Sequence, residues 1–265
     1  MKKHLLFSLL ALFSVQLFAQ IGGISGSKLR SYCVDVVDHH HIEFEPAFYY
    51  GQSRYNWNND KELQSSFLSP DSVNRYSGVG MRFTYGLFDK LEVGVSIPLD
   101  MKTGLFGARY VLMQNKEVGL ALMGGINIPM GEGNFNRGVK TEDNTTQIGI
   151  GGVFTYQKGE KFSVDANLEF DRFLKEPTST KTGTIYTSVD AGYYVFNHQL
   201  QLISAVGYEH SHLETTLNQS RLTIYPGATI EGKNFIIVLT FPFDVYGRNV
   251  NKTTGFSLAL TLTFE

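Results

Sequence analysis

The sequence predicts an all-β protein, an antiparallel transmembrane β-barrel of about twelve strands. Three observations carry this prediction: recurring alternation of apolar and polar residues, connections that alternate in length, and an N-terminus typical of exported chains. The alternation is clearest in residues 253–265, where Phe or Leu occupies every second position from Phe256 to Phe264. A strand with this period has one wholly apolar face. Lipid demands an apolar exterior and a closed hydrogen-bond ladder, which such strands supply.

Residues 1–20 have the features of a secretory signal. Lys2 and Lys3 precede an apolar run over 5–18, and Ala19 suits the cleavage site. The run is short for a transmembrane helix, and no later stretch has about 18 apolar residues. We therefore divide the chain into a signal peptide (1–20), a periplasmic lead-in (21–41) and the barrel (42–265).

The lead-in has no sustained periodicity and is rich in glycine and serine. The chain's one cysteine, Cys33, lies in it and cannot form an internal disulfide. We expect Cys33 to be a passive residue.

Strands are predicted where period-two alternation is bounded by turn residues. They cover, in chain order, 42–51, 76–86, 90–99, 104–114, 117–129, 145–157, 161–173, 184–196, 199–211, 220–230, 234–246 and 253–265. Every second connection is tight, at 87–89, 115–116, 159–160, 197–198 and 232–233. Most others are longer and polar, at 52–75, 130–144, 174–183, 212–219 and 247–252. This rhythm matches periplasmic turns and extracellular loops, and it places both termini in the periplasm.

Composition agrees with export to a membrane in strand form. The chain is only 42% hydrophobic, as expected when every strand is half polar. Without Lys2 and Lys3 there are 21 basic and 25 acidic residues, a net charge of about −4. No basic surplus favours a nucleic-acid partner.

Strand parity assigns the two faces of each strand. Outward positions are apolar: Leu91, Val93, Val95, Ile97 and Leu99; Phe162, Val164, Ala166, Leu168 and Phe170; Phe235, Ile237, Leu239, Phe241 and Phe243. A base that faces lipid at mid-depth costs about 2–4 kcal/mol, so charges belong in the lumen. The predicted lumen-facing set is Glu43, Glu45, Arg82, Glu92, Asp100, Arg109, Asp165, Asn167, Glu169, Asp171, Asp190, Glu209, Arg221 and Asp244.

The acidic row on the predicted strand 161–173 has two interpretations. Asp165, Asn167, Glu169 and Asp171 could form a cation path through the lumen. Alternatively they form a solvated wall in which acids pair with Arg82, Arg109 and Arg221. We favour the wall.

Two segments carry a resemblance to a known family. The first is Glu43-Phe44-Glu45-Pro46-Ala47-Phe48, and the second is the strand-turn-strand segment from Tyr85 to Pro98, which contains Gly86-Leu87-Phe88-Asp89. Over roughly 42–265 the chain resembles the outer-membrane transporter family named after the meta-pathway of phenol degradation. The resemblance implies a channel for small, hydrophobic molecules and no catalytic residues. Barrels of this kind usually end on an aromatic residue, whereas here Glu265 follows Phe264.

Three motifs suggest chemistry, and each has a plainer interpretation. His39-His40-His41 would need fixed spacing and further ligands to hold a metal. Ser211 adjoins His210 and His212, so in a strand it points away from both and cannot form a nucleophile–base pair. Gly149-Ile150-Gly151-Gly152 resembles a phosphate loop, but no helix follows, so small inward residues or curvature are favoured. We expect Gly78, Gly80 and Gly107 to have the same role.

These observations predict a bacterial outer-membrane channel of Gram-negative type that passes a small solute through a narrow, porin-like lumen, without a cofactor, metal or catalytic site. Small hydrophobic or aromatic compounds are the candidate solutes. The expected partners are outer-membrane lipid and lipopolysaccharide, the barrel assembly machinery and the solute. Two alternatives remain: a lipid-modifying outer-membrane enzyme and a non-conducting structural barrel. Twelve strands lie between filled and open barrels, so we expect a narrow or partly blocked lumen.

Overall fold

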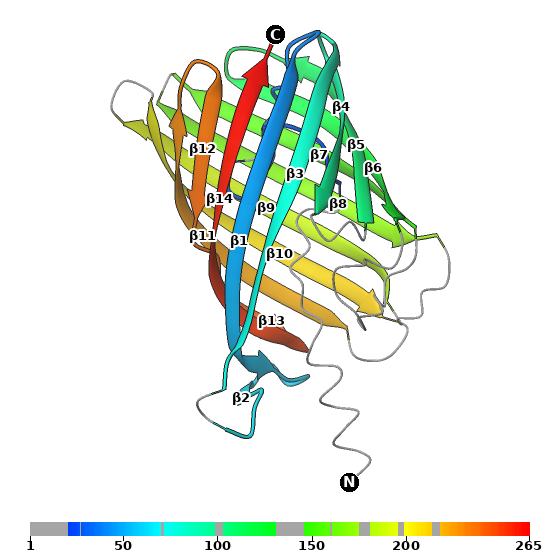
Figure 1. Cartoon of the computed structure of the whole chain (residues 1–265), viewed down its shortest axis with the longest axis vertical. Coiled ribbons are helices and arrows are strands. Elements are labelled where there is room, and N and C mark those ends of the chain that lie inside the picture. The colour runs from blue at the N-terminus through cyan, green and yellow to red at the C-terminus, as the bar shows by residue number, and fades with distance from the viewer. Residues whose placement is uncertain are drawn as a thin grey trace.

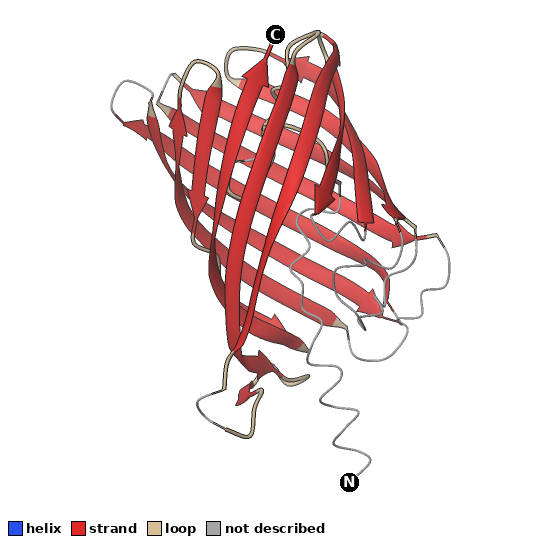
Figure 2. Cartoon of the chain, in the orientation of Figure 1, coloured by secondary structure: helices blue, strands red, loops and turns tan. Residues whose placement is uncertain are grey.

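A computed structural model describes residues 21–26, 28–69, 72–98, 103–130, 146–159, 161–174, 181–195, 199–213 and 218–265. Every regular element in these ranges is a strand (Figure 2). A search of the described residues for a helix long and apolar enough to cross a membrane finds none. The predicted signal peptide lies outside the described residues.

The structure has fourteen strand segments. They are β1 (Ile42–Trp57), β2 (Leu63–Ser65), β3 (Asn74–Phe88), β4 (Leu91–Pro98), β5 (Thr103–Gln114), β6 (Val118–Pro129), β7 (Gln147–Lys158), β8 (Phe162–Phe173), β9 (Lys181–Val195), β10 (Leu200–Leu213), β11 (Gln219–Glu231), β12 (Phe235–Thr240), β13 (Phe243–Arg248) and β14 (Val250–Phe264). β2 pairs only with the end of β1, outside the wall. β12 and β13 together make one wall strand, so the wall has the predicted twelve strands.

The wall is a closed antiparallel barrel. Successive strands pair with each other, and β14 returns to pair with β1 from Ile42↔Phe264 to Trp57↔Val250. The strands run obliquely to the long axis (Figure 1). The tight turns and the C-terminus lie at one end, and β2 lies at the other (Figure 1). This arrangement matches the predicted rhythm, in which tight turns mark the periplasmic end.

Three segments differ from prediction. The predicted loop 52–75 is partly strand, because β1 continues to Trp57 and β2 lies within it. The predicted strand 234–246 is interrupted at Phe241-Pro242, because proline has no N–H to donate to the ladder. The predicted loop 247–252 is largely strand, and Asn249 alone separates β13 from β14 with a φ of 53°. A single left-handed residue therefore replaces the loop.

The predicted faces of the strands are confirmed. Leu168 and Phe170 are 58% and 54% exposed on the barrel exterior, whereas the intervening Glu169 is 4% exposed. The same alternation holds along β12 to β13, where Phe241 and Phe243 are exposed and Asp244 is buried. Polarity is thus inverted relative to a water-soluble protein, as a lipid-facing wall requires. Leu99 lies outside the described residues.

Most of the segment predicted as a periplasmic lead-in lies inside the barrel. Residues 21–26 and 28–38, here called the plug, lie inside the barrel, where the blue segment in Figure 1 is seen. Ile21 and Ile24 are 0% exposed, and Val34 is 1% exposed. The aperiodic sequence shows only that this segment is not a strand. Its position is decided by contacts with wall residues far away in sequence.

The facing of β14 gives a prediction about stability. Leu258 is 45% exposed on the outer face beside Phe48 and Leu239, whereas its neighbour Ser257 lines a cavity in the lumen. Near the bilayer midplane Leu258→Arg should lower the free energy of unfolding by about 2–4 kcal/mol. Ser257→Arg, the matched control, should cost less because the lumen can hydrate the charge. Urea unfolding in lipid vesicles measures both, and equal costs would contradict the assigned facing.

Candidate functional site: the plugged lumen

The plug is held by the wall's charged side chains, which the sequence placed in the lumen. Asp190 on β9 makes the most complete contact. One carboxylate oxygen accepts the backbone N–H groups of Leu29 (3.0 Å) and Arg30 (2.9 Å). The other accepts the N–H of Ser31 (3.0 Å) and its hydroxyl (2.7 Å). A carboxylate bound by several backbone donors makes strong, charge-assisted hydrogen bonds.

A second clamp is the ion pair of Arg109 (β5) and Glu92 (β4), whose side chains are both fully buried and 3.0 Å apart. Glu92 accepts the N–H groups of Ser25 (2.8 Å) and Val37 (2.9 Å), at opposite ends of the plug. Arg109 donates to the carbonyls of Ser25 (3.1 Å) and Cys33 (2.6 Å). The pair therefore fixes the plug as a loop with both ends together.

Four other predicted lumen residues also contact the plug. Arg82 donates to the Ile24 carbonyl at 2.7 Å, and Asp165 pairs with Lys28 at 2.8 Å. Asn167 accepts the N–H of Tyr32 and donates to its carbonyl, and Glu169 accepts a backbone hydrogen bond from Ile21. The plug covers much of the acidic row on β8. In this conformation the row is therefore not an open cation path, and it is only partly a solvated wall.

Other predicted lumen residues pair within the wall. In the described contacts the arginines pair with acids of other strands and not, as the second interpretation proposed, with the acidic row on β8. Arg82 contacts Glu45 (2.7 Å) and Glu43 (3.4 Å), and Arg221 contacts Glu209 (2.7 Å). The remaining three predicted lumen residues, Asp244, Asp171 and Asp100, are not in the ion pairs described above. Asp244 accepts hydrogen bonds from Thr223 and Thr253, Asp171 is buried beside Gly149, and Asp100 lies outside the described residues.

A row of glycines gives the plug backbone its seat. Gly94, Gly107, Gly125 and Gly149 are register partners across β4 to β7. A Cβ added to Gly107 would overlap the carbonyl oxygen of Gly22 and crowd Ile24, both in the plug. Gly107 and Gly149 therefore make room in the lumen, as the sequence suggested, although the occupant is main chain of the plug as well as side chains.

Apolar contacts complete the seat. One cluster joins plug residues to inward side chains of β5, β6 and β7: Ile21, Ile24, Tyr32 and Val34 with Val111, Ala121, Met123 and Val153. A second joins Leu29 to Ile203, Ala205 and Val238. These inward apolar positions are the signal that sequence reasoning missed. In a water-filled lumen, inward Met123 and Val238 would expose apolar surface to water. Packing against the plug removes that surface from water and stabilises the fold.

Cys33, which the sequence predicts to be a passive residue, is a free thiol buried in the plug. Burial, and then the nearby Asp35 carboxylate, raises the pKa of its thiol. Because the thiolate is the reactive form, folded Cys33 should react slowly with maleimides. Its reactivity is therefore a reporter of whether the plug is seated.

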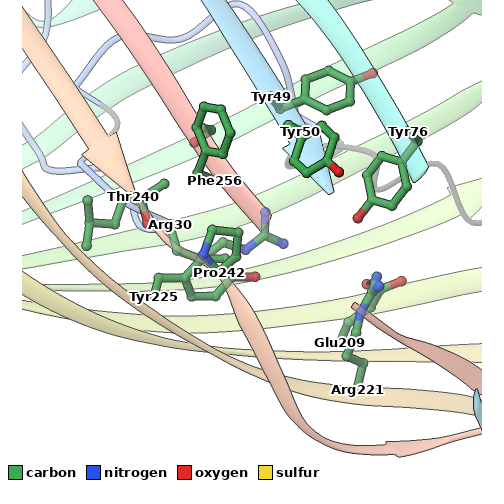
Figure 3. A pocket seen from close by; sticks show the side chains of 12 residues that line it. Arg30, Tyr49, Tyr50, Tyr76, Glu209, Arg221, Tyr225, Thr240, Pro242 and Phe256 are labelled. Atoms are coloured by element: carbon green, nitrogen blue, oxygen red, sulfur yellow. Dashed lines mark hydrogen bonds and ion pairs between the residues drawn. The ribbon is translucent and has the colours of Figure 1, made fainter. Parts of the chain in front are cut away.

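A cavity remains in the half of the lumen that faces the long loops (Figure 3). Its volume, measured as the space open to the centre of a water-sized sphere, is about 80 Å³. The plug contributes Leu29 and Arg30, and the wall contributes mainly aromatic and polar side chains: Tyr49, Tyr50, Tyr76, Glu209, Arg221, Tyr225, Thr240, Pro242, Phe256 and Ser257.

The alternative chemistries find no support in the geometry. Ser211 is 1% exposed and shares a hydrogen bond with Thr184 (3.1 Å), while exposed His212 lies on the other face of β10. His39 and His40 stack on each other at the end of the barrel that carries the tight turns, and His40 also contacts Tyr85. A search of the described residues for three or more His, Cys, Asp or Glu that could hold a metal finds no group.

The glycine seat predicts how the plug can be released. Gly107→Val should expel residues 21–24 from their seat, whereas Gly80→Val should not, because nothing lies within 4 Å of a Cβ added at Gly80. The rate of maleimide labelling at Cys33 should rise roughly tenfold or more in Gly107→Val and stay near wild type in the control. Mass spectrometry of the folded protein measures the rate. Equal protection in all three proteins would contradict this seat.

Comparison with known proteins gives the family. The family model described as "Putative MetA-pathway of phenol degradation" matches residues 48–260. The crystal structure of an outer-membrane channel from Pseudomonas putida F1 superposes with a TM-score of 0.68 at 12% identity, covering 87% of this chain and 98% of that one. A FadL homologue from Pseudomonas aeruginosa gives 0.46 at 9% identity, covering 93% and 96%.

No curated protein matches the chain. At such low identities the structural likeness shows the fold, whereas the family match spans nearly the whole wall. This outer-membrane β-barrel therefore belongs to the family described as "Putative MetA-pathway of phenol degradation".

Proposed function

We propose that this protein is an outer-membrane channel for a small solute and that the plug closes it in the conformation described here. The observation that carries the proposal is how the plug is attached. Its described backbone-to-backbone hydrogen bonds, such as Lys28 to Ser31, Cys33 to Gly26 and His41 to Asp38, stay within the segment that precedes β1. It is joined to the wall through side chains. Plug release therefore breaks no ladder hydrogen bond of the barrel.

The proposed solutes are small hydrophobic or aromatic compounds. The family resemblance suggests this class, and the cavity above the plug supports it because Tyr49, Tyr76, Tyr225 and Leu29 line it. Ligand sites are commonly concave and aromatic, with a few placed polar groups. Passage then requires the plug to leave its seat while the solute crosses.

A non-conducting structural barrel is the second candidate, and one observation favours it. The plug is packed as well as hydrogen-bonded, and the Arg109–Glu92 pair at its centre is fully buried. A plug that never leaves would make the protein a filled barrel. A measurement of flux in proteins with a weakened plug separates the two functions.

Asp190→Asn should open the channel. The substitution removes the charge that four plug donors share, and hydrogen bonds to charged groups contribute about 1.5–3 kcal/mol each. We expect the open fraction to rise by about tenfold or more. Planar-bilayer conductance and liposome swelling with a small uncharged aromatic alcohol measure it.

The matched control is Asp244→Asn, because Asp244 bonds Thr223 and Thr253 of the wall and no described plug residue. It should leave conductance and flux near wild type. A folded Asp190→Asn barrel with labelled Cys33 and no flux would show that plug release opens no path. That result would favour the structural barrel.

A further inference from the structure

Arg30 occupies an unusual position in the plug. Its backbone N–H and those of both neighbours are bound by Asp190, which fixes the main chain. Its guanidinium is one of the groups that line the cavity (Figure 3). The guanidinium stacks on the Tyr186 ring at 5.6 Å from the centroid, and no hydrogen bond from it is found among the described residues.

The nearby carboxylates do not occupy the Arg30 guanidinium. Glu209 is held by Arg221 at 2.7 Å, and the four contacts of Asp190 go to backbone N–H groups and the Ser31 hydroxyl. Glu169 and Glu209 both act on Arg30 through space, as do Tyr225 and Tyr186, and no described hydrogen bond joins either carboxylate to the guanidinium. The five donors of a guanidinium form a rigid fork that matches a carboxylate. Arg30 thus presents an anion-binding fork to the cavity.

The rest of the cavity suits a flat apolar body. Tyr49, Tyr76 and Tyr225 face the lumen by strand parity, and Pro242 and Leu29 add aliphatic surface. Figure 3 shows Tyr76 on one side of the Arg30 side chain and Tyr225 on the other. Aromatic rings pack well against planar ligands, and tyrosine hydroxyls can hydrogen-bond polar substituents.

We propose that this cavity binds a small organic carboxylate with an aromatic body, such as a benzoate-type anion. Arg30 grips the carboxylate and the wall tyrosines hold the ring. The proposal rests on the proposed channel function and narrows its solute class from aromatic compounds in general to aromatic acids. Because Arg30 belongs to the plug, the bound acid bridges plug and wall and holds the plug seated, so the acid must leave Arg30 before it can pass.

The test uses benzoate as the probe and benzamide as its neutral isostere, titrated calorimetrically into the folded full-length barrel in detergent. Benzoate should bind at least about tenfold more tightly than benzamide, because its contact with Arg30 is charge-assisted. Arg30→Met should weaken benzoate binding by at least about tenfold and leave benzamide unchanged. Arg30→Lys, which keeps the charge but not the fork, should fall between.

Two further variants guard against indirect effects. Tyr76→Leu changes the wall without touching the plug and should weaken both probes. Lys116→Met removes an exposed cation at a distant turn and should change neither. Saturating benzoate should also slow maleimide labelling of Cys33 in wild type and not in Arg30→Met.

The outcomes separate this inference from the channel function. Equal affinity for benzoate and benzamide, or unchanged benzoate binding in folded Arg30→Met, would overturn the carboxylate site. Absence of benzoate binding in a barrel that opens on Asp190→Asn would overturn the site and leave the channel standing. Selective benzoate binding without flux in any weakened-plug variant would keep the site and remove the channel.

Discussion

The structure depends on one constraint: a backbone in lipid must satisfy every N–H and C=O group internally. The chain meets it by returning β14 to β1 over the full length of both strands, so that the wall has no free edge. Closure fixes which face of each strand meets lipid. The interruption at Phe241-Pro242 is tolerated because neighbouring strands supply bonds there, with Phe241 donating to Pro226 and Pro242 accepting from Gly255.

Closure of the barrel leaves charged side chains inside the lumen, and the plug supplies hydrogen-bonding partners for them. Buried charges such as Glu92, Arg109 and Asp190 are costly unless paired or hydrogen-bonded. An irregular main chain in a dry space likewise needs partners for its peptide groups. The wall charges and the plug peptide groups satisfy one another. Wall carboxylates accept hydrogen bonds from plug N–H groups, and wall arginines donate to plug carbonyls. The plug and the charged lumen are therefore one structural unit.

The way the plug is attached also bears on function. Side-chain hydrogen bonds and small apolar clusters can be exchanged for water or a solute without damage to the ladder. A lumen sealed by sheet pairing could not open so simply. The cavity lies on the loop-facing side of this seal and carries a plug residue, Arg30, in its lining. A solute that reaches the cavity therefore meets the closing element directly.

The sequence by itself determined the wall. Period-two alternation is a local property, so it assigned Leu168 outward and Glu169 inward and separated Ser211 from His212 without reference to the fold. Only the tertiary structure decided the plug. Its contacts join residues as far apart as Leu29 and Asp190, and an inward carboxylate looks the same in sequence whether it binds water, an arginine or a peptide N–H. The glycines at 94, 107, 125 and 149 become a seat only when closure aligns their strands, because register across four strands is not encoded in any one of them.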